Sequence, residues 1–364
     1  MIKRVKIYGA GSIGNHLAHA SRSLGYKVVM CDIDEAALQR TKNDIYPKRY
    51  GLWDEAIELY KTGKEPVGGF DLIIIGTPPD THLTIALDVL KEKPKAILVE
   101  KPLCGPDLKN AQIFYEECIN KEVMAFVGYD HIVGESTNKA REIISANINQ
   151  KIETLDVEFR EYWGGIFDAH HWLDGPADSY LGYSSKGGGA TGEHSHAINL
   201  WQNFSHHLGK GKIISVNAEV KKINDGNLDY DSISCMNFKT ETGFIGRCVQ
   251  DVVTSPPKKY ARLQFSEGYL EWHCNIEAGK DRILYSYEGE LERSLDFSKT
   301  RPEDFILELK HINNVLNNPE INSPINIKKG FETMLVIAAV YKSSSLKKTI
   351  NINYDKGFNL KALT

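Results

Sequence analysis

The sequence contains no pair of cysteines spaced Cys-x-x-Cys, although six cysteines are scattered through its 364 residues. The zinc-ribbon and thioredoxin-type sites that such pairs build are therefore excluded. Scattered free thiols are typical of a reducing compartment, so the sequence predicts a cytoplasmic protein.

Long hydrophobic runs are missing as well. The longest ones, such as Leu72 to Ile75 and Leu335 to Val340, fall far short of the roughly 20 residues of a membrane span. The basic residues Lys3 and Arg4 are not followed by a long apolar stretch, which argues against a signal peptide. Neither sign of charge dominates, because the net charge is only −4. We therefore expect neither nucleic acid nor a membrane as a partner.

The bulk composition is that of a soluble globular protein, with 41% hydrophobic and 25% charged residues. A chain of 364 residues is too long for one ordinary core and suggests two domains.

A glycine motif stands near the start of the chain. The strand-like residues Val5 to Tyr8 lead directly into Gly9-Ala10-Gly11-Ser12-Ile13-Gly14, and a helical pattern follows to Leu24. The first glycine allows a tight turn, the second lets a pyrophosphate approach the backbone, and the third allows close helix–strand packing. The N–H groups at the start of the helix would bind the phosphates. This context predicts a dinucleotide site.

An acidic residue, Asp32, ends the second predicted strand, Tyr26 to Cys31. A carboxylate at this place accepts hydrogen bonds from the adenosine ribose and repels a 2′-phosphate. The next residue is Ile33 rather than an arginine, so NAD is favoured over NADP. The alternative is that Asp32 only caps a helix that begins near Glu35.

Strands and helices continue to alternate up to residue 127. We expect a helix from Trp53 to Tyr60, a helix capped by Asp80 and another from Asp107 to Ile119, between strands at 71–75, 96–99 and 123–127. Such alternation predicts a parallel sheet with helices on both faces. Ligands of these sheets bind at the carboxyl ends of the strands.

A lysine stands where one of these buried strands ends, at Glu100-Lys101-Pro102. Lysine is almost never fully buried without a partner. The glycine loop, Thr77-Pro78 and Lys101 all follow strands of the same sheet, so they should converge on one crevice. An ion pair between Lys101 and Glu100 is the structural alternative to a chemical role.

The second half has a different pattern, with strand-like runs at 152–159, 213–220, 232–238, 244–249, 261–265 and 269–273. Runs of strands with few helices predict an antiparallel sheet. We expect helices at 193–208, 304–316 and 330–345.

Together, these motifs resemble those of the Gfo/Idh/MocA oxidoreductases. The matching segments are Gly9 to Gly14, Thr77-Pro78-Pro79 with His82, Glu100-Lys101-Pro102, Val127-Gly128-Tyr129, and Gly187-Gly188-Gly189 leading into Glu193-His194-Ser195-His196. The resemblance implies a Rossmann domain at 1–127 and an α/β domain at 128–364. The second domain would contain a large, open-faced, mainly antiparallel sheet that often forms a homodimer or homotetramer contact. Its last helix, at 330–345, would pack back toward the first domain.

The resemblance also implies hydride transfer between a nicotinamide cofactor and a sugar, sugar nucleotide or polyol. Cofactor binding is expected from the glycine loop, Thr77, Pro78, His82, Glu100 and Lys101. Oxidation of a secondary alcohol needs a base for the hydroxyl proton, and Lys101 or a histidine would supply it.

The family histidine corresponds best to His196, with Glu193 as the acid that orients it. The family acid commonly stands four residues before the histidine rather than three, so His194 is a rival. Because residues two apart on a helix do not share a face, only one of the two histidines should reach the substrate.

Further substrate contacts are expected from His170, His171 and Trp172, because aromatic rings stack on sugars and imidazoles bond hydroxyls. Tyr129 and His131 follow the last Rossmann strand and would either meet the substrate from below or serve as hinge or packing residues. His170 and His171, with Glu193 and His196, could imitate a metal site, but no His-x-x-x-His or thiolate spacing supports one. We therefore expect no metal.

Two other functions remain open within this resemblance. An NAD-dependent glycosidase would oxidise its substrate transiently and recycle the cofactor. A non-catalytic dinucleotide-binding sensor would have no need of Lys101 and His196, so their presence argues against it.

Overall fold

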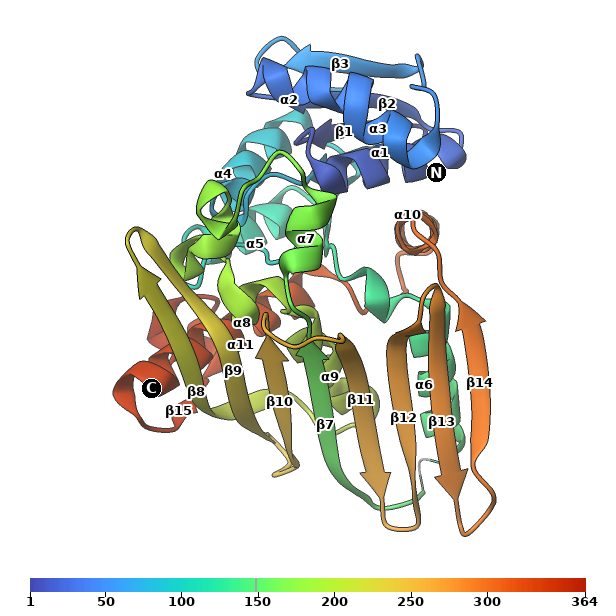
Figure 1. Ribbon diagram of the computed structural model, residues 1–364, viewed down its shortest axis with the longest axis vertical. Helices are drawn as coiled ribbons and strands as arrows, with labels where there is room; N and C mark the ends of the chain where they lie inside the picture. Colours follow the sequence, from blue (N-terminus) through green and yellow to red (C-terminus); the bar gives the residue numbers. More distant parts are fainter. Residues whose placement is uncertain (148) are drawn as a thin grey trace.

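The computed structural model describes residues 1–147 and 149–364. It contains a six-stranded sheet and a nine-stranded sheet, which lie in the upper and lower halves of Figure 1. The fold expected from the sequence, a Rossmann-type α/β domain followed by a domain with a large, mainly antiparallel sheet, is confirmed.

The first sheet is wholly parallel, with the strand order β3-β2-β1-β4-β5-β6. Its strands are β1 (Arg4–Tyr8), β2 (Lys27–Asp32), β3 (Ile57–Lys61), β4 (Leu72–Ile75), β5 (Ala96–Val99) and β6 (Met124–Val127). Every residue of β4 and β5 is buried, which explains their uninterrupted apolar sequences. The associated helices are α1 (Ser12–Ser23), α2 (Glu35–Arg40), α3 (Tyr46–Tyr50), α4 (Pro79–Val89) and α5 (Ala111–Asn120).

Three predictions for this domain were wrong in detail. The segment from Trp53 to Tyr60 is not a helix, because β3 occupies its second half and pairs with β2. Sheet pairing here overrides a weak helical pattern. Asp80 lies inside the first turn of α4 rather than capping it. α5 begins at Ala111 instead of Asp107, since Leu108 and Asn110 have positive φ angles that a helix does not allow.

The second sheet has the order β14-β13-β12-β11-β7-β10-β9-β8-β15, and only β7 and β10 pair in parallel. Its strands are β7 (Ile152–Arg160), β8 (Ile213–Asp225), β9 (Leu228–Thr240), β10 (Ile245–Asp251), β11 (Lys258–Phe265), β12 (Gly268–Glu277), β13 (Lys280–Tyr287), β14 (Arg293–Ser298) and β15 (Ile350–Asn351). The sequence analysis missed β13 and β14. Their mixture of charged and apolar residues gives no clear core-facing pattern, because β14 lies at the edge of the sheet.

Helices α6 (Glu135–Ala146), α9 (His196–His207) and α11 (Ile327–Leu346) pack on this sheet. The remaining helices are α7 (Gly164–Ala169), α8 (Gly189–Glu193) and α10 (Glu303–Asn317). The single helix expected from Glu193 to Leu208 is wrong, because the chain turns at His194 and Ser195 between α8 and α9.

The two sheets are joined tightly next to β6. The N–H of Val127 donates to the carbonyl of Ile325 (2.9 Å), in the segment just before α11. A Cβ atom at Gly330 would lie 2.6 Å from Leu103, so α11 lies directly against the loop that follows Lys101. None of the described helices is long and apolar enough to cross a membrane.

Candidate active site

A cavity of about 440 Å³ lies between the two halves of the molecule, at the carboxyl ends of the first sheet's strands. Residues of the first domain that line it include Ser12, Ile13, Glu100 and Lys101. The second domain contributes residues from the turn between α8 and α9, from β11 and from the start of α10. The crevice predicted from the strand ends is therefore present.

The glycine loop has the shape that a dinucleotide needs. A Cβ atom at Gly9, where φ is +104°, would lie 2.6 Å from the carbonyl oxygen of Gly76, and one at Gly14 would lie 2.0 Å from that of Gly9. A Cβ atom at Gly11 would meet nothing within 4 Å. Gly9 and Gly14 are thus required by close backbone packing, whereas Gly11 leaves its side of the loop open to a phosphate group.

Asp32 supports this loop directly. Its Oδ2 accepts a hydrogen bond from the N–H of Ala10 (2.7 Å), and its Oδ1 accepts one from the N–H of Asp34 (2.9 Å). The helix α2 is capped by Asp34, whose side chain accepts from Ala36, so Asp32 is not the cap. Each carboxylate oxygen keeps a lone pair for a ribose hydroxyl.

His82 lies outside the cavity. It is fully buried, and its ring nitrogens contact the carbonyl oxygens of Pro102 (3.1 Å) and Thr77 (2.6 Å). Burial lowers its pKa to about 4. The ring joins the loop after β4 to the turn that contains Lys101, so a role of His82 in cofactor binding would be an indirect one through these loops.

The ammonium group of Lys101 points across the cavity to the second domain. Its Nζ lies 3.1 Å from Oε1 of Glu193 and donates to the backbone carbonyl of the same residue (3.0 Å). The other carboxylate oxygen of Glu193 accepts from the hydroxyl of Tyr180 (3.1 Å). Glu193 therefore anchors Lys101 rather than pairing with His196.

Glu100 does not form the ion pair with Lys101 that the alternative interpretation proposed. Its Oε2 accepts from the backbone N–H of Lys101 (3.3 Å), and its buried Oε1 has no hydrogen-bond partner among the described residues. Burial, reinforced by the charge of Asp130, raises the pKa of Glu100 to about 8. A Cβ atom at Gly128 would lie 2.7 Å from this carboxyl group, so the glycine makes room for it.

The acid beside His196 is Asp130. Its Oδ1 lies 3.9 Å from Nδ1 of His196 and also accepts from the backbone N–H of His131 (2.8 Å). Burial lowers the pKa of His196 to about 3, against the opposing effect of Asp130, so the imidazole is neutral at pH 7. Because Nδ1 is buried, Nε2 is the ring nitrogen that can meet a substrate.

His194 and His196 both line the cavity, although the sequence led us to expect that only one of them reaches the substrate. That prediction assumed a continuous helix, whereas the turn between α8 and α9 changes the direction of the chain at His194. Burial also lowers the pKa of His194, to about 4.

Of the predicted substrate residues from His170 to Trp172, only His170 lines the cavity. Nε2 of His171 contacts Asp44 (2.7 Å), and Trp172 lies 5.5 Å from the guanidinium of Arg40. His171 and Trp172 thus connect the segment that follows α7 to the first domain. Figure 1 shows α7 on the side of the second domain that faces the first domain.

Tyr129 is wholly buried and packs edge-on against His196, with ring centroids 5.4 Å apart. Tyr129 therefore supports the imidazole from behind, which agrees with a packing role. His131 lines the cavity, but its Nδ1 accepts from the ammonium of Lys299 (2.9 Å).

Asp130, His131 and His196 place three potential metal-ligating atoms within 4.8 Å of one another. The ammonium of Lys299 occupies one nitrogen of His131 and adds a positive charge beside this group. Since metal ligands must be free of competing cations, we assign no metal to these residues.

Sequence reasoning missed many residues of the cavity, among them Arg49, Asp130, Lys259 and Arg301. Asp130 directly follows the motif residue Tyr129, so its position was a usable signal. The other three lie on α3, on β11 and before α10, where no local pattern marks them.

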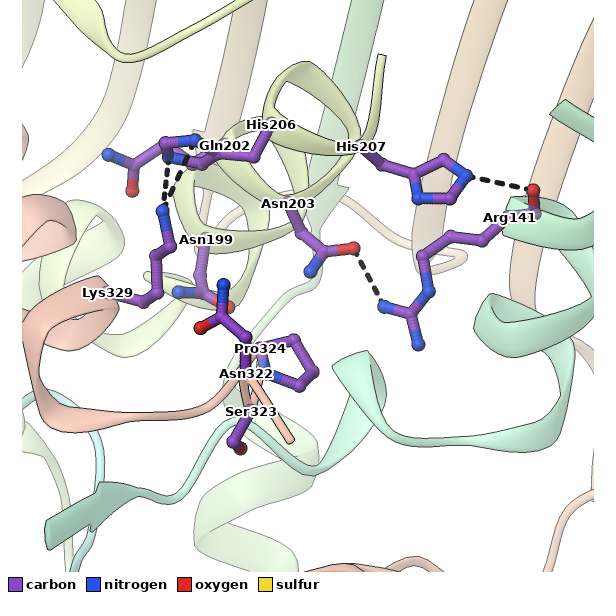
Figure 2. A pocket seen from close by; sticks show the side chains of 10 residues that line it. All are labelled: Arg141, Asn199, Gln202, Asn203, His206, His207, Asn322, Ser323, Pro324 and Lys329. Atoms are coloured by element: carbon purple, nitrogen blue, oxygen red, sulfur yellow. Dashed lines mark hydrogen bonds between the residues drawn. The ribbon is translucent and has the colours of Figure 1, made fainter. Parts of the chain in front are cut away.

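A second polar hollow of about 480 Å³ lies among α6, α9 and the segment before α11 (Figure 2). Arg141 donates there to Asn203 (3.0 Å), and Lys329 pairs with Glu332 (3.3 Å). None of the predicted site residues lines it, so the cavity at Lys101 is the better candidate for the active site.

Comparison with known proteins agrees with this geometry. Residues 3–129 match the family model GFO_IDH_MocA, an oxidoreductase family with an NAD-binding Rossmann fold. No curated protein matches the chain at a significant level.

Several solved structures share the whole fold at low sequence identity. Levoglucosan dehydrogenase in complex with NADH and levoglucosan is 15% identical, with a TM-score of 0.76 over 96% of this chain and 99% of that chain. An oxidoreductase from Agrobacterium radiobacter in complex with NAD+, L-tartaric acid and magnesium is 15% identical, with a TM-score of 0.74 over 96% and 98%. The WlbA dehydrogenase from Bordetella pertussis, in complex with NADH and UDP-GlcNAcA, is 15% identical, with a TM-score of 0.72 over 97% and 98%. The first domain therefore matches an NAD-binding oxidoreductase family over residues 3–129, and the chain as a whole shares its fold with these solved structures.

Proposed function

We propose that the protein transfers hydride between NAD and a secondary hydroxyl or ketone of a sugar, sugar nucleotide or polyol. The observation that carries this proposal is the pairing of a neutral imidazole with an ammonium group in one cavity. His196 and Lys101 come from different domains and both line the space next to the glycine loop.

In the oxidative direction His196 acts as the general base. Burial lowers its pKa to about 3, so the imidazole is unprotonated at physiological pH and its Nε2 is free to accept the hydroxyl proton, although the low pKa by itself makes the ring a weak base. The imidazolium that forms would then face the carboxylate of Asp130, 3.9 Å away. The reductive direction is the reverse of this step and requires that Asp130 stabilise the imidazolium in the complex, so that the ring can give its proton to the carbonyl oxygen.

Lys101 has an electrostatic role in this scheme. Its ammonium group, held in an ion pair with Glu193, would stabilise negative charge on the reacting oxygen. Glu193 and Tyr180 fix its position. The bound NAD supplies a carbon that accepts or donates the hydride.

The preference for NAD over NADP rests on Asp32. Its carboxylate is held against the glycine loop by the N–H of Ala10, at the place where a 2′-phosphate would have to lie. The following residue, Ile33, is 81% exposed and offers no positive charge.

A carbohydrate substrate is supported by the structural relatives. Their bound molecules include levoglucosan and UDP-GlcNAcA, and the site here offers several imidazoles and the amide of Asn275 for hydroxyl groups. The glycosidase alternative has no specific observation in its favour.

The test is to incubate the purified protein with NAD and a panel of sugars, sugar nucleotides and polyols, and to record the absorbance of NADH. We expect NADH to accumulate with at least one compound, and Lys101→Met to abolish it. Release of an aglycone without NADH would instead indicate the glycosidase, and cofactor binding without either reaction would indicate a sensor.

We also infer a homodimer or homotetramer formed through the nine-stranded sheet. Helices α6, α9 and α11 pack on this sheet, while Ile245 of β10 is 57% exposed. Sedimentation analysis would detect the assembly, and Ile245→Lys should weaken it. The cytoplasmic location stays a prediction from the six free cysteines.

A further inference from the structure

The polar hollow of the second domain is a separate feature from the cavity at Lys101. Its volume is about 480 Å³, and the two share no lining residue. Half of its lining lies on α9, at positions 199, 202, 203, 206 and 207, which is the spacing of one helix face. Figure 2 shows Asn199 and Asn203 extending from α9 toward the segment that contains Asn322.

Two amide side chains of this helix face are buried and only partly bonded. Asn199 and Gln202 are each 3% exposed, and both contact Thr333 of α11. Nδ2 of Asn199 donates to the threonine hydroxyl (3.0 Å), which in turn donates to Oε1 of Gln202 (2.7 Å). Among the described residues, Oδ1 of Asn199 and Nε2 of Gln202 have no hydrogen-bond partner. Because unpaired buried amide atoms are destabilising, they indicate a place where a bound molecule completes the bonding.

The hollow also contains a cation whose charge no acid compensates. The guanidinium of Arg141, on α6, donates to Oδ1 of Asn203 (3.0 Å) and to Oδ1 of Asn138, and both are neutral amide oxygens. Glu142, the next acid along α6, pairs with Lys139 instead (2.9 Å). In the part of the chain that the structure describes, no Asp or Glu lines this hollow, whereas four acids line the cavity at Lys101. A guanidinium in such a setting favours a bound anion.

The other side of the hollow is positive as well. Figure 2 shows Lys329 opposite Arg141, and Lys329 lies in the first turn of α11, a 20-residue helix whose N-terminal end carries the positive end of its dipole. The ammonium of Lys329 lies 3.3 Å from Oε2 of Glu332, and Lys212 lies 3.7 Å from Oε1. One carboxylate is thus shared by two lysines, which leaves an excess of positive charge.

We propose that this hollow binds a small polar metabolite that carries a carboxylate or a phosphoryl group. The anionic oxygens bind Arg141, since a guanidinium pairs well with either group. The amides of Asn199 and Gln202 bind polar groups of the same molecule, one as an acceptor and the other as a donor. The volume of about 480 Å³ lies within the range of small-molecule sites.

The anionic group of this molecule lies outside the reach of the proposed catalytic residues. His196 is the first residue of α9, and Asn203, which bonds Arg141, follows seven residues later. Seven residues correspond to about 10 Å along a helix axis. The hollow is therefore a second ligand site, and the inference does not depend on the proposed hydride transfer.

The test is isothermal titration calorimetry of the full chain, loaded with NADH so that the cofactor site is filled. The probes are inorganic phosphate, D-glucose 6-phosphate and D-gluconate, with neutral D-glucose for comparison. We expect at least one of the three anions to bind, and Arg141→Gln to weaken it roughly 10- to 100-fold, the range of a hydrogen bond to a charged group. Any binding of D-glucose should not depend on Arg141.

A second variant separates the loss of charge from damage to the fold. Asn203→Asp keeps the size of the side chain and its hydrogen bond from Arg141, but its carboxylate compensates the guanidinium. It should weaken the anion at least tenfold while the melting temperature stays at or above that of the native protein. Arg293→Gln, which removes a surface arginine paired with Glu290 (2.6 Å), is the matched control and should bind the anion like the native protein.

The arms of the experiment distinguish the two anionic groups. Tighter binding of D-gluconate would assign a carboxylate, and tighter binding of the phosphates a phosphoryl group. If none of the three anions bound, or if Arg141→Gln and Asn203→Asp bound them as tightly as the native protein, the proposal would be wrong. Because no arm measures formation of NADH, failure of the dehydrogenase function would leave this result unchanged.

Discussion

The carboxylate of Asp130 should contribute to catalysis through the charge it presents to His196. We consider Asp130→Asn, which keeps the shape of the side chain and its acceptor for the N–H of His131 but removes the negative charge. At about 4 Å, two unit charges interact by about 4 kcal/mol in a medium of effective dielectric constant 20. Oδ1 of Asp130 lies 3.9 Å from Nδ1 of His196, so this energy is an upper limit for the stabilisation of a full imidazolium.

The proton is only partly transferred in the transition state, so we expect about half of that energy, or roughly 2 kcal/mol, to appear in the rate. This corresponds to a fall in kcat of about 30-fold. The assay is steady-state formation of NADH with a saturating substrate from the panel. The control is Asp304→Asn, which removes another buried carboxyl that faces Lys299 rather than His196.

A readout beyond rate separates this effect from general damage to the fold. The Kd for NAD and the melting temperature should change no more in Asp130→Asn than in Asp304→Asn. If kcat for Asp130→Asn fell by less than about threefold, or if Asp304→Asn lost as much, then Asp130 would not stabilise the imidazolium and this assignment would have to be abandoned.

Two further predictions concern the cofactor end of the cavity. Burial raises the pKa of Glu100 to about 8, so its contribution to the free energy of unfolding is complete below the unfolded-state pKa near ~4.3 and is lost as the pH rises through about 8. Relative to the native protein, the Glu100→Gln variant should therefore gain stability between pH 5 and pH 8. This gain should be at most roughly 1.4 kcal/mol per pH unit. Chemical denaturation at both pH values measures this gain, Glu320→Gln at an exposed position is the control, and a pH-independent difference would contradict the assignment. Asp32→Asn should narrow the preference for NAD over NADP by roughly tenfold, because it removes the charge that repels a 2′-phosphate. Fluorescence titration with both reduced cofactors measures the two Kd values, and an unchanged ratio would show that Asp32 does not set the preference.

Much of the first domain was predictable because its signals are local. The contacts of Gly9 and Gly14 follow from the spacing of the glycine motif, and the burial of β4 and β5 follows from their apolar runs. β3 was missed because its pairing with β2 is a long-range interaction that overrides a short helical pattern.

The site itself was only partly predictable. Lys101 and His196 were found from motifs, but the acid assigned to His196 was wrong because Glu193 reaches Lys101 instead. That outcome depends on the turn between α8 and α9, which no periodicity indicates. Arg49 and Arg301 lie in segments with no motif, and only the packing of the two domains brings them to one cavity.

The most direct test of the account follows deuterium from substrate to cofactor in the native protein and in two histidine variants. The substrate is the best compound of the panel, deuterated at its carbinol carbons, and mass spectrometry measures the label in NADH. The account predicts deuterium in NADH for the native protein, a loss of roughly 10²- to 10⁴-fold in rate for His196→Asn, and a smaller loss for His194→Asn. Unlabelled NADH, or equal activity of His196→Asn and the native protein, would contradict hydride transfer with His196 as the base.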